Sequence, residues 1–262
     1  MKLRKIFKVF GLAIILAVAG LYYYARPKYV APILMYHHID ERGGVSSLSV
    51  SPENFRRQMR FLSEHNYNVI SLAEFVQAKL EKKRLARNTV VLTFDDGYED
   101  NYLLAYPVLK KYSLPAIIFV IVGSIGEEGY LNHRQIKEMS SSGIIDIGSH
   151  TLSGAYLPGQ SRGELNREIG LSKKTLEANL NNRTEFFCYP IGGFSPGIQE
   201  IVKRCGYAAA CTTNRGKAKD RLNNDLFALK RIKIKDSFPN LFVFRVKLSG
   251  YYNLFRRVRE PH

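Results

Sequence analysis

An apolar run that ends in two adjacent carboxylates constrains this chain more than any other stretch. Residues 90–97 read Val-Val-Leu-Thr-Phe-Asp-Asp-Gly. The apolar, β-branched part predicts a buried strand, whose side chains alternate between two faces. Because the chain starts to turn at Gly97, we expect both carboxylates, Asp95 and Asp96, to reach one cavity. A cation, an arginine or water must offset their repulsion, whereas an acidic helix cap, the alternative, needs one carboxylate only.

The composition indicates a globular protein with a strongly basic surface. The 262 residues are 45% hydrophobic, which suffices for one large α/β domain or two small ones. The chain has 39 basic and 23 acidic residues and a net charge of +16, which predicts an anionic neighbour such as a lipid surface or an acidic polymer. The sequence contains no zinc-finger, RNP or P-loop pattern, so we expect no nucleic-acid partner. We also expect no obligate protein partner.

The N-terminal stretch has the features of a membrane segment. Residues 9–25 form a charge-free run of about 17 residues, near the lower limit for a spanning helix. The positive flank that precedes the run predicts a cytoplasmic N-terminus and a domain outside the cytoplasm, in the periplasm or on the cell surface. We predict an uncleaved anchor over residues 1–30. A cleaved signal peptide is the alternative, because Ala17-Val18-Ala19 matches a small-x-small cleavage pattern.

Predicted strands alternate with predicted helices over residues 31–239. This order predicts βαβ units and a mainly parallel sheet, and about seven or eight strands suit a closed or nearly closed β/α barrel. Functional residues of such barrels gather at the carboxyl ends of the strands. Polar or turn-forming residues follow apolar runs directly at four places: His37 and His38, Asp95 and Asp96, His150, and Ile191 with Gly192.

Three cysteines, Cys188, Cys205 and Cys211, fit no metal-binding spacing. Their odd number leaves at least one thiol unpaired in an exported protein. Cys188 and Cys211 lie in strand-like stretches, so we expect them to serve as small buried apolar residues rather than as redox groups.

Three motifs together resemble the polysaccharide deacetylases with a NodB homology domain, carbohydrate esterase family 4. They are Thr93–Gly97, Ser149-His150-Thr151 and the segment Phe187–Gly192. The opening segment Leu34–Ile39 is similar to the branch that contains the biofilm poly-N-acetylglucosamine deacetylases. The resemblance implies an α/β fold, a distorted (β/α)7 barrel, and metal-dependent hydrolysis of an acetyl group on a hexosamine polymer.

The resemblance also implies a role for each motif residue. Asp95 matches the base that takes a proton from a metal-bound water, and Asp96 and His150 match metal ligands. The Ile191 N–H matches the donor that stabilises the oxyanion. His37 matches the histidine that protonates the leaving amine, whereas we expect His38 to support its neighbours. The metal is expected to be zinc.

The histidine motif departs from the pattern of that family. The third protein ligand should be a histidine four or five residues after His150, where this chain has Gly154 and Ala155. Two protein ligands hold zinc weakly, so we expect a weakly bound ion. A histidine at position 154 would restore the ligand unless Gly154 needs a positive φ. His133 is a possible substitute ligand, although a capping or solvent-facing role is the alternative.

A second departure concerns an arginine. Cys188 stands where many relatives have an arginine that keeps the base ionised. Arg231, on a late predicted strand, is a candidate to replace it, with a surface or polymer contact as the alternative.

These observations predict a membrane-anchored, extracytoplasmic hydrolase that acts on carbon–nitrogen bonds other than peptide bonds. Its substrate would be an acetylated hexosamine polysaccharide, with N- or O-acetyl groups. A catalytically weak or inactive barrel that binds glycan is the alternative, because a metal ligand is missing. The basic, aromatic tail at residues 240–262 suits an interfacial helix, an anionic-polymer surface or a terminal helix packed on the barrel.

Overall fold

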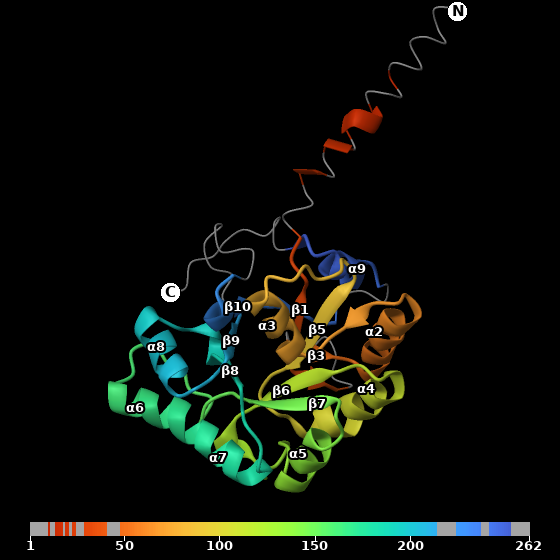
Figure 1. The fold of residues 1–262 in the computed structure, drawn as a ribbon. Helices are drawn as coiled ribbons and strands as arrows, with labels where there is room; N and C mark the ends of the chain where they lie inside the picture. The colour runs from red at the N-terminus through yellow and green to blue at the C-terminus, as the bar shows by residue number, and fades with distance from the viewer. Residues whose placement is uncertain are drawn as a thin grey trace, which may run out of the picture.

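A computed structural model describes residues 10, 14–17, 19–20, 23–24, 29–40, 48–213, 224–236 and 241–252. Nearly all described residues from 29 onward form a parallel barrel surrounded by helices (Figure 1). The strands are β1 (Ile33–Tyr36), β2 (His38–Ile39), β3 (Ser49–Val50), β4 (Asn68–Val69), β5 (Thr89–Phe94), β6 (Ala116–Val120), β7 (Ile145–Ser149), β8 (Phe186–Cys188), β9 (Ala209–Thr212), β10 (Leu229–Lys230) and β11 (Ile232–Lys233). The α-helices are α2 (Pro52–Glu64), α3 (Leu72–Leu80), α4 (Tyr106–Tyr112), α5 (His133–Ser140), α6 (Arg162–Asn166), α7 (Ser172–Leu180), α8 (Pro196–Arg204) and α9 (Phe242–Leu248).

The main sheet runs in the order β10-β9-β8-β7-β6-β5-β1-β11, and every pair along it is parallel. Its two ends, β10 and β11, are separated in the chain by Arg231 alone. The segment 229–233 therefore pairs with β9 through its first half and with β1 through its second half. The sheet closes almost completely into a barrel at this point, as expected from the sequence, and Arg231 lies at the closure.

Alternation along β5 separates an inner face from an outer face. Val90, Leu92 and Phe94 pack in one cluster with the inner faces of helices α2, α4 and α5. Val91 packs in a second cluster with Phe119 and side chains of β1, β8 and β9, and α3 covers this cluster through Phe75. Because side chains two apart share a face, Thr93 and Asp95 point into the barrel with Val91.

Two helical segments contain wider turns than an α-helix. The first begins with a π-helical segment, Asn101–Ala105, before α4. The second is divided into α6, a π-helical segment at Arg167–Leu171, and α7. Such π segments are frequent at functional sites, and both lie beside loops that carry predicted site residues.

The N-terminal and C-terminal predictions fall partly outside the described residues. Most of residues 9–25 are not described, and within the described part of the chain no helix has the length and apolarity needed to cross a bilayer. The predicted membrane segment at residues 9–25 stays a prediction from the sequence. In the tail, α9 packs on the barrel through the buried residues Phe244 and Leu248, while Phe242 is 67% exposed.

Candidate active site at the carboxyl ends of the strands

Asp95 and Asp96 follow β5 and both join the polar side chains at this end of the barrel, because the backbone turns at Asp96. Asp96 has a φ of 71° and Gly97 a φ of 76°. The turn predicted at the glycine thus starts one residue earlier. Left-handed backbone is unfavourable for a residue with a side chain and clusters at functional sites. Three non-glycine residues of the motifs have it: Asp96, Thr151 and Ile191, with φ values of 71°, 68° and 59°.

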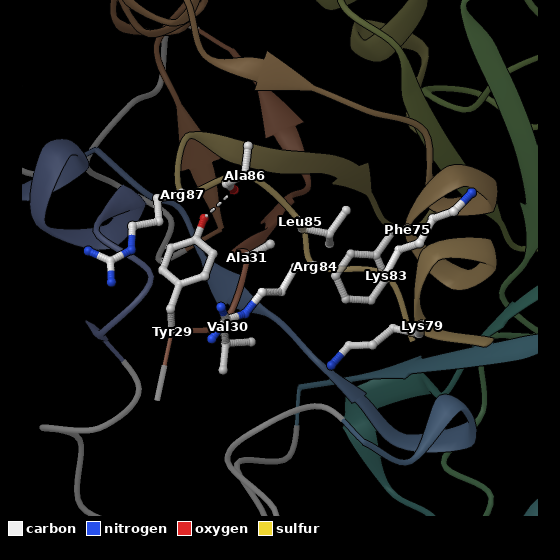
Figure 2. Close-up of a pocket in the computed structure, with 10 residues that line it drawn as sticks. All are labelled: Tyr29, Val30, Ala31, Phe75, Lys79, Lys83, Arg84, Leu85, Ala86 and Arg87. Carbon is white, nitrogen blue, oxygen red and sulfur yellow. Dashed lines mark hydrogen bonds between the residues drawn. The ribbon is translucent and has the colours of Figure 1, made fainter. Parts of the chain in front are cut away.

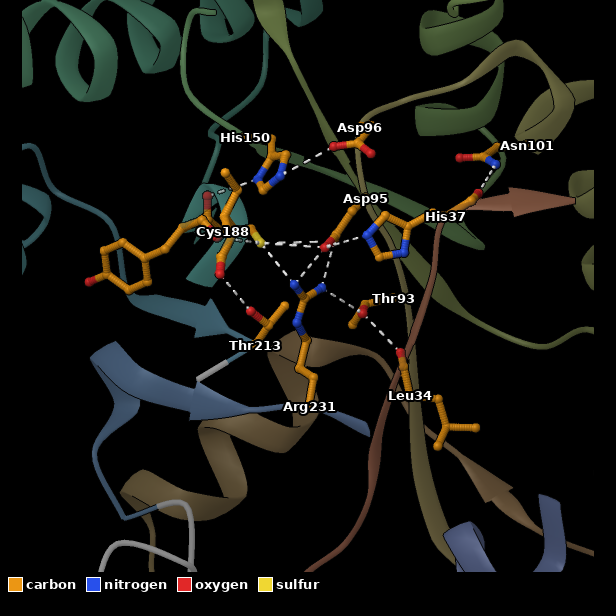
Figure 3. A network of polar contacts seen from close by, with 12 residues as sticks. Leu34, His37, Thr93, Asp95, Asp96, Asn101, His150, Cys188, Thr213 and Arg231 are labelled. Atoms are coloured by element: carbon orange, nitrogen blue, oxygen red, sulfur yellow. Dashed lines mark hydrogen bonds and ion pairs between the residues drawn. The ribbon is translucent and has the colours of Figure 1, made fainter. Parts of the chain in front are cut away.

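Asp95 and Arg231 form a buried, two-pronged ion pair inside the barrel (Figure 3). One guanidinium nitrogen donates to Asp95 Oδ1 at 2.5 Å and the other to Oδ2 at 2.6 Å. The first nitrogen also donates to Thr93 Oγ1 at 3.0 Å, and the second lies 3.0 Å from Cys188 Sγ. Thr93 in turn donates to the carbonyl of Leu34 at 2.8 Å. These contacts fix both the position and the plane of the carboxylate.

The ion pair sets the protonation states inside the barrel. Burial alone would raise the pKa of Asp95, but the adjacent guanidinium lowers that pKa to about 2. Burial opposes the charge on Arg231 as well, yet Asp95 raises the pKa of the guanidinium above its usual value. Burial raises the pKa of the Cys188 thiol. At neutral pH Asp95 is therefore a carboxylate, Arg231 a cation and Cys188 a neutral thiol.

His150 follows β7 and faces Asp96. Its Nδ1 lies 2.9 Å from the backbone carbonyl of Cys188, and its Nε2 lies 3.4 Å from Asp96 Oδ1. A carbonyl oxygen only accepts, so Nδ1 must carry the proton of this hydrogen bond. In the neutral ring the lone pair of Nε2 then points at a carboxylate oxygen. A proton or a metal ion between the two atoms removes this repulsion.

The donor set at His150 and Asp96 fits a divalent metal ion. A ligating histidine usually donates its other N–H to a carbonyl or carboxylate, as His150 does here. The described residues also place Asp95, His150 and Cys188 donor atoms within 4.8 Å of one another. That triad is a poor metal site, because Arg231 occupies both oxygens of Asp95 and would repel the ion. Asp96 and His150 are therefore the pair of side chains that could hold a divalent ion here.

His37, which follows β1, lies next to the Asp95 carboxylate. Its Nε2 lies 3.8 Å from Asp95 Oδ2, and burial lowers the pKa of the imidazole although the two aspartates oppose this shift. The buried amide of Asn101 donates to the backbone carbonyl of His37 at 2.8 Å and so anchors the loop after β1. His37 is therefore a neutral imidazole held beside a carboxylate.

His38 belongs to a neighbouring cluster and makes no hydrogen bond or ion pair with Asp95 or Asp96. Its Nδ1 lies 2.7 Å from Asp100 Oδ2, and its ring stacks on Tyr98 with centroids 3.5 Å apart. Asp100 Oδ1 accepts from Asn101 at 2.7 Å. This chain of contacts supports the loop that carries His37, which agrees with the supporting role expected for His38.

Two threonines at the end of β9 hold the turn that carries Ile191. Thr212 donates to the carbonyl of Gly192 at 2.8 Å, and Thr213 donates to the carbonyl of Ile191 at 2.9 Å. A β-branched residue at a φ of 59° is a strained conformation that its surroundings must enforce. Among the described residues the Ile191 N–H has no hydrogen-bond partner, and the residue is 77% exposed. This N–H is thus available to donate to a bound molecule.

The loop after His150 is fixed in a form without a third protein ligand. Glu168 accepts from the backbone N–H groups of Leu152 and Ser153 at 3.1 and 2.9 Å. Gly154 has a φ of 73°, and a Cβ on it would lie 2.8 Å from a methyl group of Ile121. Gly154 thus has the positive φ that a histidine would resist, so the backbone does not suit a histidine at this position.

His133 is the exposed first residue of α5, and the metal-donor groups found among the described residues do not include it. The structure therefore favours the solvent-facing alternative for this histidine. Asn132, the residue before it, caps the helix through its side chain.

Sequence reasoning missed the residues that position the site. Asn101, Thr93, Thr212 and Thr213 hold the catalytic candidates. Thr93 opens the Thr93–Gly97 motif, but sequence reasoning assigned it no role, and the other three belong to no motif. Their places were the available signal, since Thr212 and Thr213 end the strand-like stretch that contains Cys211 and Asn101 follows the Asp-Asp-Gly turn closely. All three cysteines are free, and Cys188 and Cys211 are buried as expected.

Comparisons with known proteins agree with this geometry. Residues 82–210 match the polysaccharide deacetylase family profile. YxkH of Bacillus subtilis, whose name places it among polysaccharide deacetylases, is 35% identical over 203 residues, which cover 78% of this chain and 71% of YxkH. The chain belongs to the polysaccharide deacetylase family.

Three further proteins of known name or structure are similar to this chain. The deacetylase PplD of Streptococcus pyogenes, solved with acetate, is 32% identical, with a TM-score of 0.71 over 79% of this chain and 92% of PplD. A poly-β-1,6-N-acetyl-D-glucosamine N-deacetylase of Staphylococcus aureus is 28% identical over 210 residues, 75% of this chain and 72% of that protein. The solved IcaB of Ammonifex degensii is 26% identical, with a TM-score of 0.72 over 85% of this chain and 97% of IcaB.

Proposed function

We propose that this protein is a metal-dependent hydrolase that removes N-acetyl groups from an extracytoplasmic hexosamine polysaccharide. The observation that carries the proposal is the His150–Asp96 contact. Nδ1 of His150 is committed to a carbonyl, so its Nε2 lone pair and an Asp96 oxygen converge at 3.4 Å on a position that suits a cation. A divalent ion bound there would polarise the acetyl carbonyl and lower the pKa of a bound water.

Asp95 is the proposed general base. Its carboxylate lies next to Asp96, and its low pKa keeps it ionised and ready to accept a proton throughout the neutral range. A carboxylate of such low pKa is a weak base, so the water that it deprotonates must already be acidified. Arg231 aims the carboxylate through its two hydrogen bonds and acts as a positioning residue.

Ile191 is proposed to stabilise the negative charge that develops on the carbonyl oxygen, and His37 is proposed to protonate the leaving nitrogen. The Ile191 N–H, held by Thr213, would donate to the oxyanion of the tetrahedral intermediate. His37, neutral at rest, would first take from Asp95, 3.8 Å away, the proton that the attacking water gives up, and would then donate it to the leaving nitrogen. Its lowered pKa favours this transfer, because a weakly basic imidazole gives up a proton readily.

The polysaccharide is proposed from the relatives. One of them is named as acting on poly-β-1,6-N-acetyl-D-glucosamine, and this neutral polymer is the first substrate to test. We also propose that residues 9–25 anchor the chain in a membrane, with the barrel outside the cytoplasm. The support for this is the sequence alone: an uncharged apolar run after a cationic flank.

A glycan-binding protein without hydrolytic activity is the second candidate function. The observation that favours it is the loop after His150, where Gly154 and its fixed backbone supply no third protein ligand. Catalytic zinc sites usually have three protein ligands. Substrate oxygens or water would have to complete the coordination in an active enzyme.

The test is deacetylation by the purified full-length protein in detergent micelles. Acetylated β-1,6-glucosamine oligomers are incubated with and without added Zn²⁺, and released acetate and free amines are counted. Release that depends on Zn²⁺ and is lost in Asp95→Asn supports the enzyme. Glycan binding without acetate release, for wild type and for every metal added, would support the binding protein instead.

A further inference from the structure

A basic pocket lies at the end of the barrel opposite the candidate active site. It has a volume of about 380 Å³ and is formed by three segments: residues 29–31, which lead into β1, helix α3, and the loop 83–87, which leads into β5 (Figure 2). Both β1 and β5 start here and end at the carboxylates and histidines described above. The pocket and the active site are therefore separated by the length of the barrel.

The lining of the pocket carries charge of one sign. Among the described residues, the pocket is lined by four cationic side chains and no acidic one: Lys79, Lys83, Arg84 and Arg87. Lys79 is half-buried, and burial lowers the pKa of its ammonium group. Glu81 pairs with Lys83 outside the pocket at 2.5 Å. The residues that line this concave space are net positive, so the pocket favours an anion over a cation.

The pocket has a fixed frame. Tyr29 donates from its hydroxyl to the carbonyl of Ala86 at 3.2 Å, which ties the entering chain to the basic loop. The Tyr29 ring also packs edge-on against Tyr251, and it lies so close to Gly250 that a Cβ there would overlap it. The backbone N–H of Val30 donates to the backbone carbonyl of Gly250 at 3.1 Å. The N-terminal entry, the basic loop and the chain after α9 therefore meet in one place.

The sequence before the pocket connects it to the proposed membrane segment. Four residues take the chain from Ala25 to Tyr29, and they include Arg26 and Lys28. A fully extended chain spans at most about 14 Å over four residues. If residues 9–25 enter a bilayer, the pocket is held beside its surface, where anionic headgroups attract basic residues. Leu80, at the end of α3, is 62% exposed and adds an apolar group at this end of the barrel.

We propose that this pocket binds the phosphate group of an anionic phospholipid headgroup. The two arginines, Arg84 and Arg87, offer planar donor pairs that suit a phosphate better than an ammonium does. Binding would hold the barrel with its active site directed away from the bilayer, toward an extracellular polymer. The inference rests on the proposed membrane segment, and it is independent of the proposed hydrolysis.

The test measures thermal stabilisation of full-length protein in detergent micelles. Dihexanoyl phosphatidylglycerol is added to one sample and dihexanoyl phosphatidylcholine to another, and Tm is followed at each lipid concentration. Specific binding raises Tm in the first sample only. The variant Arg84→Gln/Arg87→Gln is expected to weaken the apparent affinity for phosphatidylglycerol at least fivefold. The control Lys110→Gln/Lys111→Gln removes the same charge from exposed positions on α4 and is expected to bind like wild type.

Three outcomes would overturn the proposal. Equal stabilisation by both lipids would show that the headgroup charge is not recognised. An equal loss in the control variant would show that net charge, not the pocket, is responsible. Equal stabilisation by soluble glycerol 1-phosphate would show a free phosphate site rather than a lipid site. Deacetylase activity is measured alongside, and it is expected to be unchanged in both variants, so failure of the proposed hydrolysis is recognised separately.

Discussion

Arg231 and Asp95 are 136 positions apart in the chain, yet they form two parallel hydrogen bonds of 2.5 and 2.6 Å inside the barrel. Arg231 reaches this position because it lies between β10 and β11, where the sheet closes. The family resemblance implies an arginine at the position of Cys188 on strand β8. In this chain Cys188 lies there instead, 3.0 Å from the guanidinium of Arg231. The cation over the base carboxylate is thus supplied from a different strand.

Removal of Arg231 is expected to cost both stability and activity. Arg231→Leu leaves the Asp95 carboxylate buried without its partner, which destabilises a protein by about 3–5 kcal/mol. Arg231→Lys keeps the charge but loses the two-pronged geometry, so kcat should fall while the fold is largely retained. Denaturant unfolding and acetate release measure the two effects. Wild-type kcat in Arg231→Lys would contradict the positioning role.

The Asp95 ion pair also predicts how stability depends on pH. The pKa of Asp95 is lowered from 3.8 to about 2 in the folded chain. A lowered pKa stabilises the folded state above the unfolded pKa, and this contribution is lost as the pH falls from about 4 toward 2. The contribution is roughly 2 kcal/mol at neutral pH.

The measurement compares wild type with Asp95→Asn/Arg231→Met, which removes both charges. The difference in unfolding free energy between the two proteins should be constant from pH 7 to about pH 5 and should shift against wild type below about pH 4. A difference that does not change with acid would show that Asp95 is not held by the arginine.

Asp95→Asn alone should reduce kcat by about 100-fold or more, as expected for loss of a general base.

The threonines at the end of β9 are expected to affect turnover through the Ile191 turn. Thr212→Val and Thr213→Val each remove one hydroxyl that holds a carbonyl of this turn. A misplaced oxyanion donor should lower kcat by about 10- to 100-fold and leave KM nearly unchanged. Thr184→Val is the matched control for Thr212→Val, because Thr184 is as buried as Thr212 and its hydroxyl has no partner among the described residues. Equal losses in all three variants would indicate general destabilisation instead.

A histidine added after His150 should tighten metal binding only at a position where the backbone accepts it. Ala155 does not have a positive φ, whereas Gly154 does. We expect wild type to lose zinc on dialysis and Ala155→His to bind zinc at least about 10-fold more tightly. Gly154→His should instead lower Tm without a gain in affinity. Zinc content after dialysis and calorimetric titration measure this. A wild type that keeps one zinc per chain through exhaustive dialysis would mean that another donor completes the site.

Local sequence determined the strands, the turns and the residues that meet at the carboxyl end of the barrel. The alternation along β5 is a property of neighbouring residues, so it already places Val91, Thr93 and Asp95 on one face. The same is true of the apolar runs before His37, His150 and Ile191. These signals need only the period of a strand and the rule that parallel strands end at one edge.

Tertiary structure alone decided which side chains support these residues. The contact between Arg231 and Asp95 depends on closure of the barrel, and the contact between Thr213 and Ile191 depends on the pairing of β8 with β9. The left-handed backbone at Asp96 and Gly154 depends on the loops packed around it. Such contacts join segments far apart in the chain, and a residue's own neighbours in the sequence carry no information about a partner that the fold brings to it.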